Sequence, residues 1–346
     1  MYWSQLKSST MAATKTVTAR KASRIEATMI SRISPALTSD DTRLCRTDGH
    51  IKVGRSYCKR NPKGSVAAPG FVTKAVLTWV LDMLERGQSV AMASVIEASG
   101  SVPGKPGARM AVTEKGARFG TVGGAGLELK VENALRGMLN GGRAEVRQKG
   151  GKVETFVLYK DAKEQEATPL DSLCGGRVTV SMEVIDPVPH VLIAGGGHVG
   201  RCVALVCDTL GWSHSVFDVR EDYADENTYP YASELHPSSV HGFLKEEDSE
   251  SLSRFSDILL LGHDWSVDQD LLLGLLAKSD GAPRPRIGAI GSKVKWKAFR
   301  EAAITQGLSE GVVDSVRCPI GLDIGADSPE EIAVAVCAEI MALEKA

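Results

Sequence analysis

A glycine-rich loop that directly follows an apolar strand constrains this chain more than any other feature. A buried strand is predicted over residues 190–194, a helix is predicted over residues 199–210, and Gly195-Gly196-Gly197-His198-Val199-Gly200 connects them. In this G-x-G-x-x-G pattern, glycine lets the backbone turn tightly and approach a phosphate, which faces the N–H groups and dipole of the helix. Gly195, Gly197 and Gly200 therefore indicate a phosphate-bearing ligand, with simple helix-on-strand packing as the alternative.

Two polar residues near this loop refine the prediction without fixing the ligand. Asp218 ends the next predicted strand about twenty residues on, where an acid can accept hydrogen bonds from a ribose diol. Arg220 follows two positions later and could instead meet a second phosphate. His198 is unusual inside such a loop: its imidazole could contact a phosphate or a metal-bound group, or could point to solvent.

The order of predicted elements divides the chain into two folded domains of an α/β protein. From residue 188 to 346, strands and helices alternate, which is typical of a Rossmann-like, doubly wound parallel sheet. Residues 71–186 read as a mixed α+β domain, and the linker between the two contains Pro187 and Pro189. Residues 1–70 are rich in Ser, Thr, Lys and Arg and are expected to be a disordered extension; a transit peptide or a misassigned start would read alike.

Composition excludes several classes of function. The chain has 346 residues, 43% hydrophobic and 24% charged residues, and a net charge of −2. It has no apolar run long enough to cross a membrane and no overall basic field, so neither a membrane nor nucleic acid is expected as a partner. The seven cysteines form no CxxC pair, which favours a reducing, cytoplasmic location and predicts neither a disulfide framework nor a metal site.

Two further glycine-rich loops lie in the first domain. They cover residues 99–110 and 120–128, and each joins a strand to another element. Such loops expose main-chain N–H groups that can bind an anion, to which Lys105 and Arg109 add positive charge. They could also be ordinary long hairpin loops.

The loops belong to an ordered series of motifs that resembles the XdhC/CoxI family. Ser-x-Pro-x-x-x-Gly-Ala-Arg-Met is followed by Gly-Thr-x-Gly-Gly and Leu-Glu, as in the N-terminal domain of that family. The resemblance continues to about residue 340, through the segments 173–177, 195–200, 262–265, 290–293, 318–325 and 329–333. The ordered series is far more specific than any one motif.

The resemblance implies an accessory protein of molybdenum hydroxylases such as xanthine dehydrogenase. Such a protein binds the molybdenum cofactor, a phosphate-bearing pterin dithiolene, supports its sulfuration and inserts it into the client enzyme. This implies a cofactor-insertion chaperone more than an enzyme, with the hydroxylase and a cysteine desulfurase as partners. A symmetric homodimer is the expected assembly.

The matched motifs add candidate cofactor-binding residues. They are Arg109, Gly123, Gly124, Glu128 and Cys174 in the first domain, and His263, Asp264 and Ser292 in the second. Many family members carry a cysteine before the Leu-Glu, where this chain has Gly124-Ala125-Gly126, so a functional thiol would have to be Cys174, which could also be structural. Asp264 could simply cap a turn, and Glu128 could simply face the dipole of its helix.

In a doubly wound sheet, ligands bind at the carboxyl ends of the strands. His263, Asp264 and Ser292 should therefore line the same crevice as the Gly195 loop. Two other functions remain open. In one, a nicotinamide-dependent oxidoreductase uses the Gly195 loop and Asp218 to bind NAD(P) and uses His263 for proton transfer. In the other, the Rossmann-like domain only docks partner proteins.

Overall fold

The computed structural model describes residues 69–140, 151–158, 168–169, 175–279 and 284–345. These residues form an antiparallel sheet with helices, followed by a Rossmann-like domain with a parallel sheet, which confirms the predicted α/β fold class. Residues 1–68, for which an extension was predicted, and Cys174 lie outside the described residues. No helix among the described residues is both long and apolar enough to cross a membrane.

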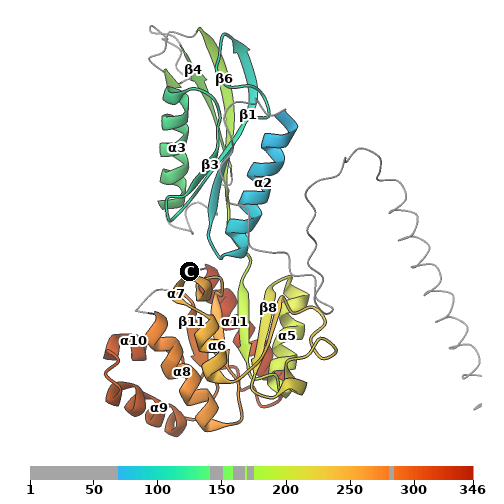
Figure 1. Cartoon of the computed structure of the whole chain (residues 1–346), viewed down its shortest axis with the longest axis vertical. Coiled ribbons are helices and arrows are strands. Elements are labelled where there is room, and N and C mark those ends of the chain that lie inside the picture. The colour runs from blue at the N-terminus through green and yellow to red at the C-terminus, as the bar shows by residue number, and fades with distance from the viewer. Residues whose placement is uncertain (1–68, 141–150, 159–167, 170–174, 280–283, 346) are drawn as a thin grey trace, which may run out of the picture. The chain divides into compact units, whose positions relative to one another are not determined.

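The first sheet has six strands in the order β3-β2-β1-β6-β4-β5 (Figure 1). Its strands are β1 (Val90–Gly100), β2 (Arg109–Thr113), β3 (Arg118–Gly120), β4 (Lys152–Val157), β5 (Thr168–Pro169) and β6 (Gly176–Ile185). All neighbours are antiparallel except β4 and β5. Strands β2 and β3 form a hairpin, and Gly116 in its turn has a φ of +87°.

Two helices cover opposite faces of this sheet: α2 (Pro69–Glu85) and α3 (Ala125–Asn140). The central strand β1 is apolar at successive positions, so it can bury both faces. Ala91, Ala93 and Val95 pack in the core with α3, whereas Val90 and Met92 pack with α2. This follows from the two-residue period of a strand, which points successive side chains to opposite faces.

The second sheet is parallel, in the order β11-β10-β7-β8-β9. Its strands are β7 (His190–Ala194), β8 (Ser213–Asp218), β9 (Glu234–Pro237), β10 (Asp257–Leu260) and β11 (Arg286–Ala289). The chain builds outward from β7 in one direction through β8 and β9, and in the other through β10 and β11. The switch point of this topology therefore lies between β7 and β10.

The helices of this domain fall on two faces of the sheet (Figure 1). They are α5 (His198–Leu210), α6 (Val240–Glu246), α7 (Ser249–Leu252), α8 (Trp265–Ser279), α9 (Lys293–Thr305), α10 (Glu310–Asp314) and α11 (Pro329–Lys345), with a short 3-10 turn η1 (Glu221–Tyr223). Leu192 and Leu260 face the core with α8 and α9, whereas Val191, Ile193 and Leu259 face the core with α5 and α11. The strands are thus buried on both faces, as parallel strands normally are.

Local signals in the sequence place the ends of several helices. Gly211 ends α5 in the left-handed conformation, with a φ of +68°. Ser328 and Glu331 form a capping box at the start of α11, because the Ser328 hydroxyl accepts from the Glu331 N–H and the Glu331 carboxylate accepts from the Ser328 N–H. Helix α8 begins at Trp265, six residues before the apolar run that starts at Leu271.

The first strand of the parallel sheet carries a half-buried histidine whose pKa is lowered in the folded protein. His190 Nε2 lies 2.8 Å from Ser215 Oγ, and its ring packs edge-on against Phe255. Burial is the main cause that lowers the pKa of His190 from 6.5 to about 4; Glu234 opposes this shift and Arg254 adds to it. Between these two pH values the unfolded chain binds a proton at this position that the folded chain does not.

We therefore predict that His190→Gln reduces the loss of stability in acid. The contribution of His190 is complete above pH 6.5 and is lost as the pH falls towards 4, with an upper bound of about 3 kcal/mol. Urea unfolding at a series of pH values should give a shallower fall of unfolding free energy for the variant than for the wild type. Equal slopes in the two proteins would contradict this assignment.

Candidate functional site at the carboxyl edge of the parallel sheet

The Gly195 loop lies at the switch point of the parallel sheet, beside the end of β10. A Cβ atom added at Gly195 would lie 2.7 Å from the backbone N of Gly262, so the two segments touch. Gly195 has a φ of +121°, which only glycine adopts readily. The structure thus brings the Gly195 loop and the start of the 262–265 segment together, as the topology predicts.

The three glycines of the pattern play three different roles. Gly195 makes the tight turn, and Gly200 lets α5 approach the strand, because a Cβ there would lie 2.2 Å from the carbonyl oxygen of Gly195. Gly197 has no atom within 4 Å of an added Cβ. Open space at Gly197 is what a ligand needs if it is to reach the backbone of the loop.

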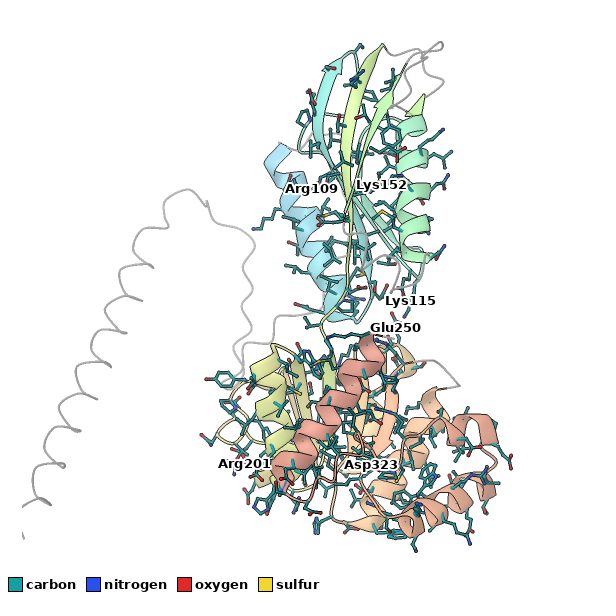
Figure 2. The ribbon with its side chains drawn as sticks, turned by 180° about the vertical axis from the view of Figure 1, so that it is seen from behind. Arg109, Lys115, Lys152, Arg201, Glu250 and Asp323 are labelled. Atoms are coloured by element: carbon teal, nitrogen blue, oxygen red, sulfur yellow. The ribbon has the colours of Figure 1, made fainter. Side chains whose placement is uncertain are left out.

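The N-terminus of α5 has the properties of an anion site. Gly197 is its N-cap residue and no side chain caps the helix, so its first N–H groups lack a side-chain acceptor. His198 is exposed at the first helical position, and Arg201 is exposed one turn later on α5 (Figure 2). Two side chains that can carry positive charge therefore stand beside a helix N-terminus, where the dipole also favours an anion.

Asp218, the predicted ribose acceptor, already makes four hydrogen bonds within the protein. Its Oδ2 accepts from the Gly196 N–H at 2.9 Å and from Arg220 Nη2 at 2.8 Å. Its Oδ1 accepts from the backbone N–H of Arg220 at 3.0 Å and from Nε at 2.9 Å. The side chain is only 4% exposed, so the carboxylate ties β8 to the glycine loop and holds a guanidinium.

These hydrogen bonds keep the carboxyl group of Asp218 ionised. Burial alone would raise the pKa of its carboxyl group, but the hydrogen bonds from Arg220 and Gly196 outweigh burial and hold the pKa below its usual value. A carboxylate has about four acceptor positions, and all four are filled here. A ribose diol could bind Asp218 only by displacing Arg220 or Gly196.

The segment after Asp218 folds over the second glycine of the loop. The guanidinium of Arg220 stacks on the ring of Tyr223, 3.6 Å from its centroid. The carbonyl oxygen of Tyr223 would lie 1.8 Å from a Cβ added at Gly196, so only glycine fits beneath this segment. The loop is thereby covered at Gly196 and open at Gly197.

A buried tyrosine completes this side of the site. Tyr229 is 3% exposed, and its hydroxyl would lie 3.3 Å from a Cβ at Gly196. Within the described part of the chain this hydroxyl has no hydrogen-bond partner, although a buried O–H normally has one. Burial raises the pKa of Tyr229, so the group stays protonated and can donate a hydrogen bond.

The other candidates of the Rossmann-like domain also lie at strand ends. His263 and Asp264 follow β10 and are exposed. Asp264 Oδ1 accepts from the backbone N–H groups of Ser266 and Val267, so this carboxylate caps α8. Ser292 follows β11 and caps α9, since its hydroxyl oxygen accepts from the Lys295 N–H at 3.3 Å.

A buried ion pair at the same edge was not predicted from the sequence. Lys295 Nζ lies 2.7 Å from Asp268 Oδ2 and 3.3 Å from the carbonyl oxygen of Ile290. Asp268 is 2% exposed, and burial raises its pKa although Lys295 opposes the shift. The pair joins the first turns of α8 and α9 to the ends of their strands. No sequence motif predicts the pair, because Asp268 and Lys295 are 27 residues apart and each is an ordinary residue for the first turn of a helix.

The candidates of the first domain are held by local contacts. Arg109 Nη1 donates to the Thr73 hydroxyl and to the Gly107 carbonyl. A Cβ at Gly123 would lie 2.4 Å from the backbone N of Gly104, so the two glycine-rich loops pack backbone against backbone. This interlock explains part of their glycine content without a ligand.

The start of α3 carries the remaining two candidates. Gly124 lies against the Pro103 ring, where an added Cβ would approach within 2.8 Å. The Glu128 carboxylate accepts a hydrogen bond from the Thr121 hydroxyl, and Thr121 Oγ1 accepts from the Gly123 N–H. Glu128 thus organises the loop that precedes its helix.

One acidic cluster elsewhere has the composition of a metal site but the contacts of an ion-pair network. Ligand atoms of Glu234, His236 and Glu247 lie within 4.8 Å of one another. Arg254 Nη2 lies 2.6 Å from both Glu234 Oε2 and Glu247 Oε1, so a guanidinium already occupies the centre of the cluster. The positive charge of Arg254 therefore balances these carboxylates in the place that a metal ion would take.

Comparison with known proteins assigns both parts of the chain to one family. The model of the XdhC Rossmann domain matches residues 191–340, and the model of the XdhC and CoxI family matches residues 83–149. The chain belongs to the XdhC and CoxI family. The two matches bracket the motif series, and the Rossmann match contains the Gly195 loop, Asp218 and the edge residues described above.

Two curated proteins are similar to parts of this chain. The chain is 28% identical over 268 residues to the uncharacterized protein YqeB of Escherichia coli, covering 77% of this chain and 46% of YqeB. It is 29% identical over 162 residues to a probable xanthine dehydrogenase subunit of Bacillus subtilis, covering 46% of this chain and 44% of that protein. The chain therefore spans less than half the length of these two relatives.

Among solved structures, one similar protein is described as a xanthine dehydrogenase from Bacillus halodurans. It is 18% identical, with a TM-score of 0.39, over 79% of this chain and 95% of that one.

We predict that Asp218→Asn destabilises the Rossmann-like domain by about 1–3 kcal/mol at neutral pH, because the amide turns a donor towards donors and leaves Arg220 without its anion. The stabilisation by Asp218 is present above pH 3.8 and is lost as the pH falls towards its lower folded pKa. The midpoint of thermal unfolding should therefore be lower for the variant than for the wild type, and this gap should close in acid.

Asp323→Asn, which removes the same charge at an exposed position (Figure 2), is the control. A gap no larger than that of the control would contradict the role given to Asp218.

Proposed function

We propose that this chain binds the molybdenum cofactor, supports its sulfuration and inserts it into a molybdenum hydroxylase such as xanthine dehydrogenase. Membership of the XdhC and CoxI family suggests an accessory role in maturation of this cofactor. The observation that carries the proposal is the form of the Gly195 loop, which is open at Gly197 and closed at Gly196. In this role the cofactor is cargo that is bound and released.

The first step of the argument concerns the phosphate of the cargo. A phosphate reaching Gly197 meets the N-terminus of α5, which no side chain caps. His198 and Arg201 are exposed next to it, and the Tyr229 hydroxyl, which lies beside Gly196, has a free proton to donate. Backbone N–H groups, a helix dipole and nearby cations are the usual means of binding a phosphate.

The second step concerns the choice between this cargo and a nicotinamide dinucleotide. Dinucleotide binding in this fold uses the acid at the end of the second strand to accept the ribose hydroxyls. Here Asp218 gives its acceptor positions to Arg220 and Gly196, and the 221–229 segment covers the loop at Gly196. The site thus favours a ligand that carries a phosphate but needs no ribose acceptor, as the pterin form of the cofactor does.

The remaining edge residues are proposed to contact the rest of the cargo. His263 and Ser292 are exposed at the ends of β10 and β11 and can exchange hydrogen bonds with polar groups of a pterin. Asp264 and the Asp268–Lys295 pair fix the helix starts behind them. In this proposal, Asp264, Asp268 and Lys295 position the loops and do not contact the cargo.

The first domain is proposed to hold a further part of the binding surface. Arg109, Gly123, Gly124, Glu128 and Cys174 are its candidates, and the division into domains at 71–186 and 188–346 is retained as part of the proposal. The hydroxylase client and a cysteine desulfurase are the proposed partners, and the cytoplasm is the proposed compartment. A catalytic activity is not part of the proposal.

The sharpest test is Gly197→Leu, in anaerobic titrations with molybdenum cofactor followed by absorption and metal content. A Cβ added at Gly197 meets no atom within 4 Å, so we expect the fold to be retained while the leucine side chain blocks the approach to α5. We expect saturable uptake by the wild type and a loss of at least about tenfold in affinity in the variant, the equivalent of about 1.4 kcal/mol.

Gly311→Leu is the matched control, because Gly311 also has open space but lies on α10. It should bind as the wild type does. Parallel titrations with NADH and NADPH should show no binding at the loop. Tight nicotinamide binding without uptake of molybdenum cofactor would make the chain an oxidoreductase, and unchanged cofactor uptake by Gly197→Leu would remove the loop from the site.

A further inference from the structure

Two buried thiols lie against each other where α5 packs on α11 (Figure 1). Cys207 of α5 is fully buried, and Cys337 of α11 is 2% exposed. A hydrogen bond between the two side chains is the main cause that raises the pKa of the Cys207 thiol, and burial adds to this shift. Four cysteines lie in the described part of the chain, and all four are free. Cys207 and Cys337 are therefore a dithiol whose sulfur atoms are already neighbours.

A groove between α5 and α11 leads to one member of this pair. Its volume is about 390 Å³, and Cys337 lines it whereas Cys207 does not. A small molecule that enters the groove thus reaches Cys337 first, with Cys207 directly behind it. The described residues that line the groove are apolar apart from Lys345, and they include Val206, Leu210, Val334 and Met341.

The apolar lining decides which reagents can approach Cys337. Moving a charged group from water into an apolar groove costs free energy that no partner there would repay, whereas an uncharged aromatic or alkyl group gains by burial. Cys202 and Cys318 differ in this respect, because both are partly exposed and neither lines the groove. The groove therefore gives Cys337 a selectivity that these two cysteines lack.

We propose that Cys207 and Cys337 form a modification site, at which small uncharged disulfides that enter the groove oxidise the dithiol to an intramolecular disulfide. The Cys337 thiolate attacks one sulfur of the reagent, whose S–S bond breaks, and the first half leaves as a thiolate that takes up the proton. Cys207 Sγ then attacks Cys337 Sγ in the mixed disulfide, and the second half leaves as a thiol. Two protein thiols are oxidised, and the reagent is reduced to two thiols.

The expected product joins two helices that are far apart in the sequence. Helix α5 starts at the Gly195 loop, and α11 lies at the end of the described chain. A cross-link between them restricts the unfolded chain over the long segment from Cys207 to Cys337, so the oxidised protein should unfold at a higher temperature than the reduced one. The inference does not depend on which ligand the Gly195 loop binds.

The first test compares two aromatic disulfides on the reduced full chain. Dithiodipyridine is uncharged, whereas dithiobis-nitrobenzoate carries a carboxylate on each ring. Mass spectrometry of peptides from unreduced protein should find the Cys207–Cys337 cross-link after the uncharged reagent and little or none after the charged one. Cys202 and Cys318 should react with both. Absence of the cross-link with the uncharged reagent, or equal yields with the two reagents, would overturn the proposal.

The second test uses variants and the midpoint of thermal unfolding. Cys207→Ala should stop at the mixed disulfide on Cys337, and its midpoint should not rise on oxidation. Cys202→Ala is the matched control on the same helix: it should still cross-link, and its midpoint should rise on oxidation and return on reduction with dithiothreitol, as in the wild type. A rise in Cys207→Ala equal to that of the wild type would contradict the assignment.

Val334→Trp tests the groove without touching either thiol. Val334 is 52% exposed, so we expect the fold to be retained while the larger side chain fills the entrance. Cross-linking by dithiodipyridine should be slower than in the wild type, with the reaction at Cys202 unchanged. An unchanged rate of cross-linking would show that reagents reach Cys337 by another route and would overturn the role given to the groove.

Discussion

The buried carboxylate of Asp218 is the constraint on which the candidate site depends. It joins the end of β8 to the glycine loop through the Gly196 N–H and fixes Arg220 through two side-chain bonds. Arg220 in turn stacks on Tyr223, whose carbonyl oxygen covers Gly196. One residue therefore decides that the loop is closed at Gly196 and open at Gly197. The choice of ligand follows from that closure, because the carboxylate has no acceptor position left for a ribose.

The same logic applies to the first turns of the helices around the site. Asp264 caps α8, Ser292 caps α9, and the Asp268–Lys295 pair ties both helices to the strand ends. Asp264 and Ser292, which the sequence pattern predicts as ligand contacts, thus also cap helices by accepting hydrogen bonds from backbone N–H groups. Asp264 and Ser292 are held by these hydrogen bonds before any ligand arrives, so binding has less conformational entropy to overcome.

Sequence patterns predicted what depends on local rules. The strand at His190–Ala194, the helix that follows it and the parallel second sheet all follow from apolar runs, the glycine loop and the alternation of strands and helices. The bond from the Gly196 N–H to Asp218 and the pairing of Lys295 with Asp268 could not be predicted in this way, because they depend on which segments meet after folding. Tyr229 was not predicted as a site residue for the same reason. Its hydroxyl becomes a candidate only because folding places it next to Gly196.

A crystal structure of the chain with molybdenum cofactor bound tests the central claim most directly. The account predicts a phosphate on the backbone of Gly197 and His198 at the start of α5, with the Arg220 guanidinium still paired to Asp218. A ligand whose ribose hydroxyls bind the Asp218 carboxylate, with Arg220 displaced, would contradict it.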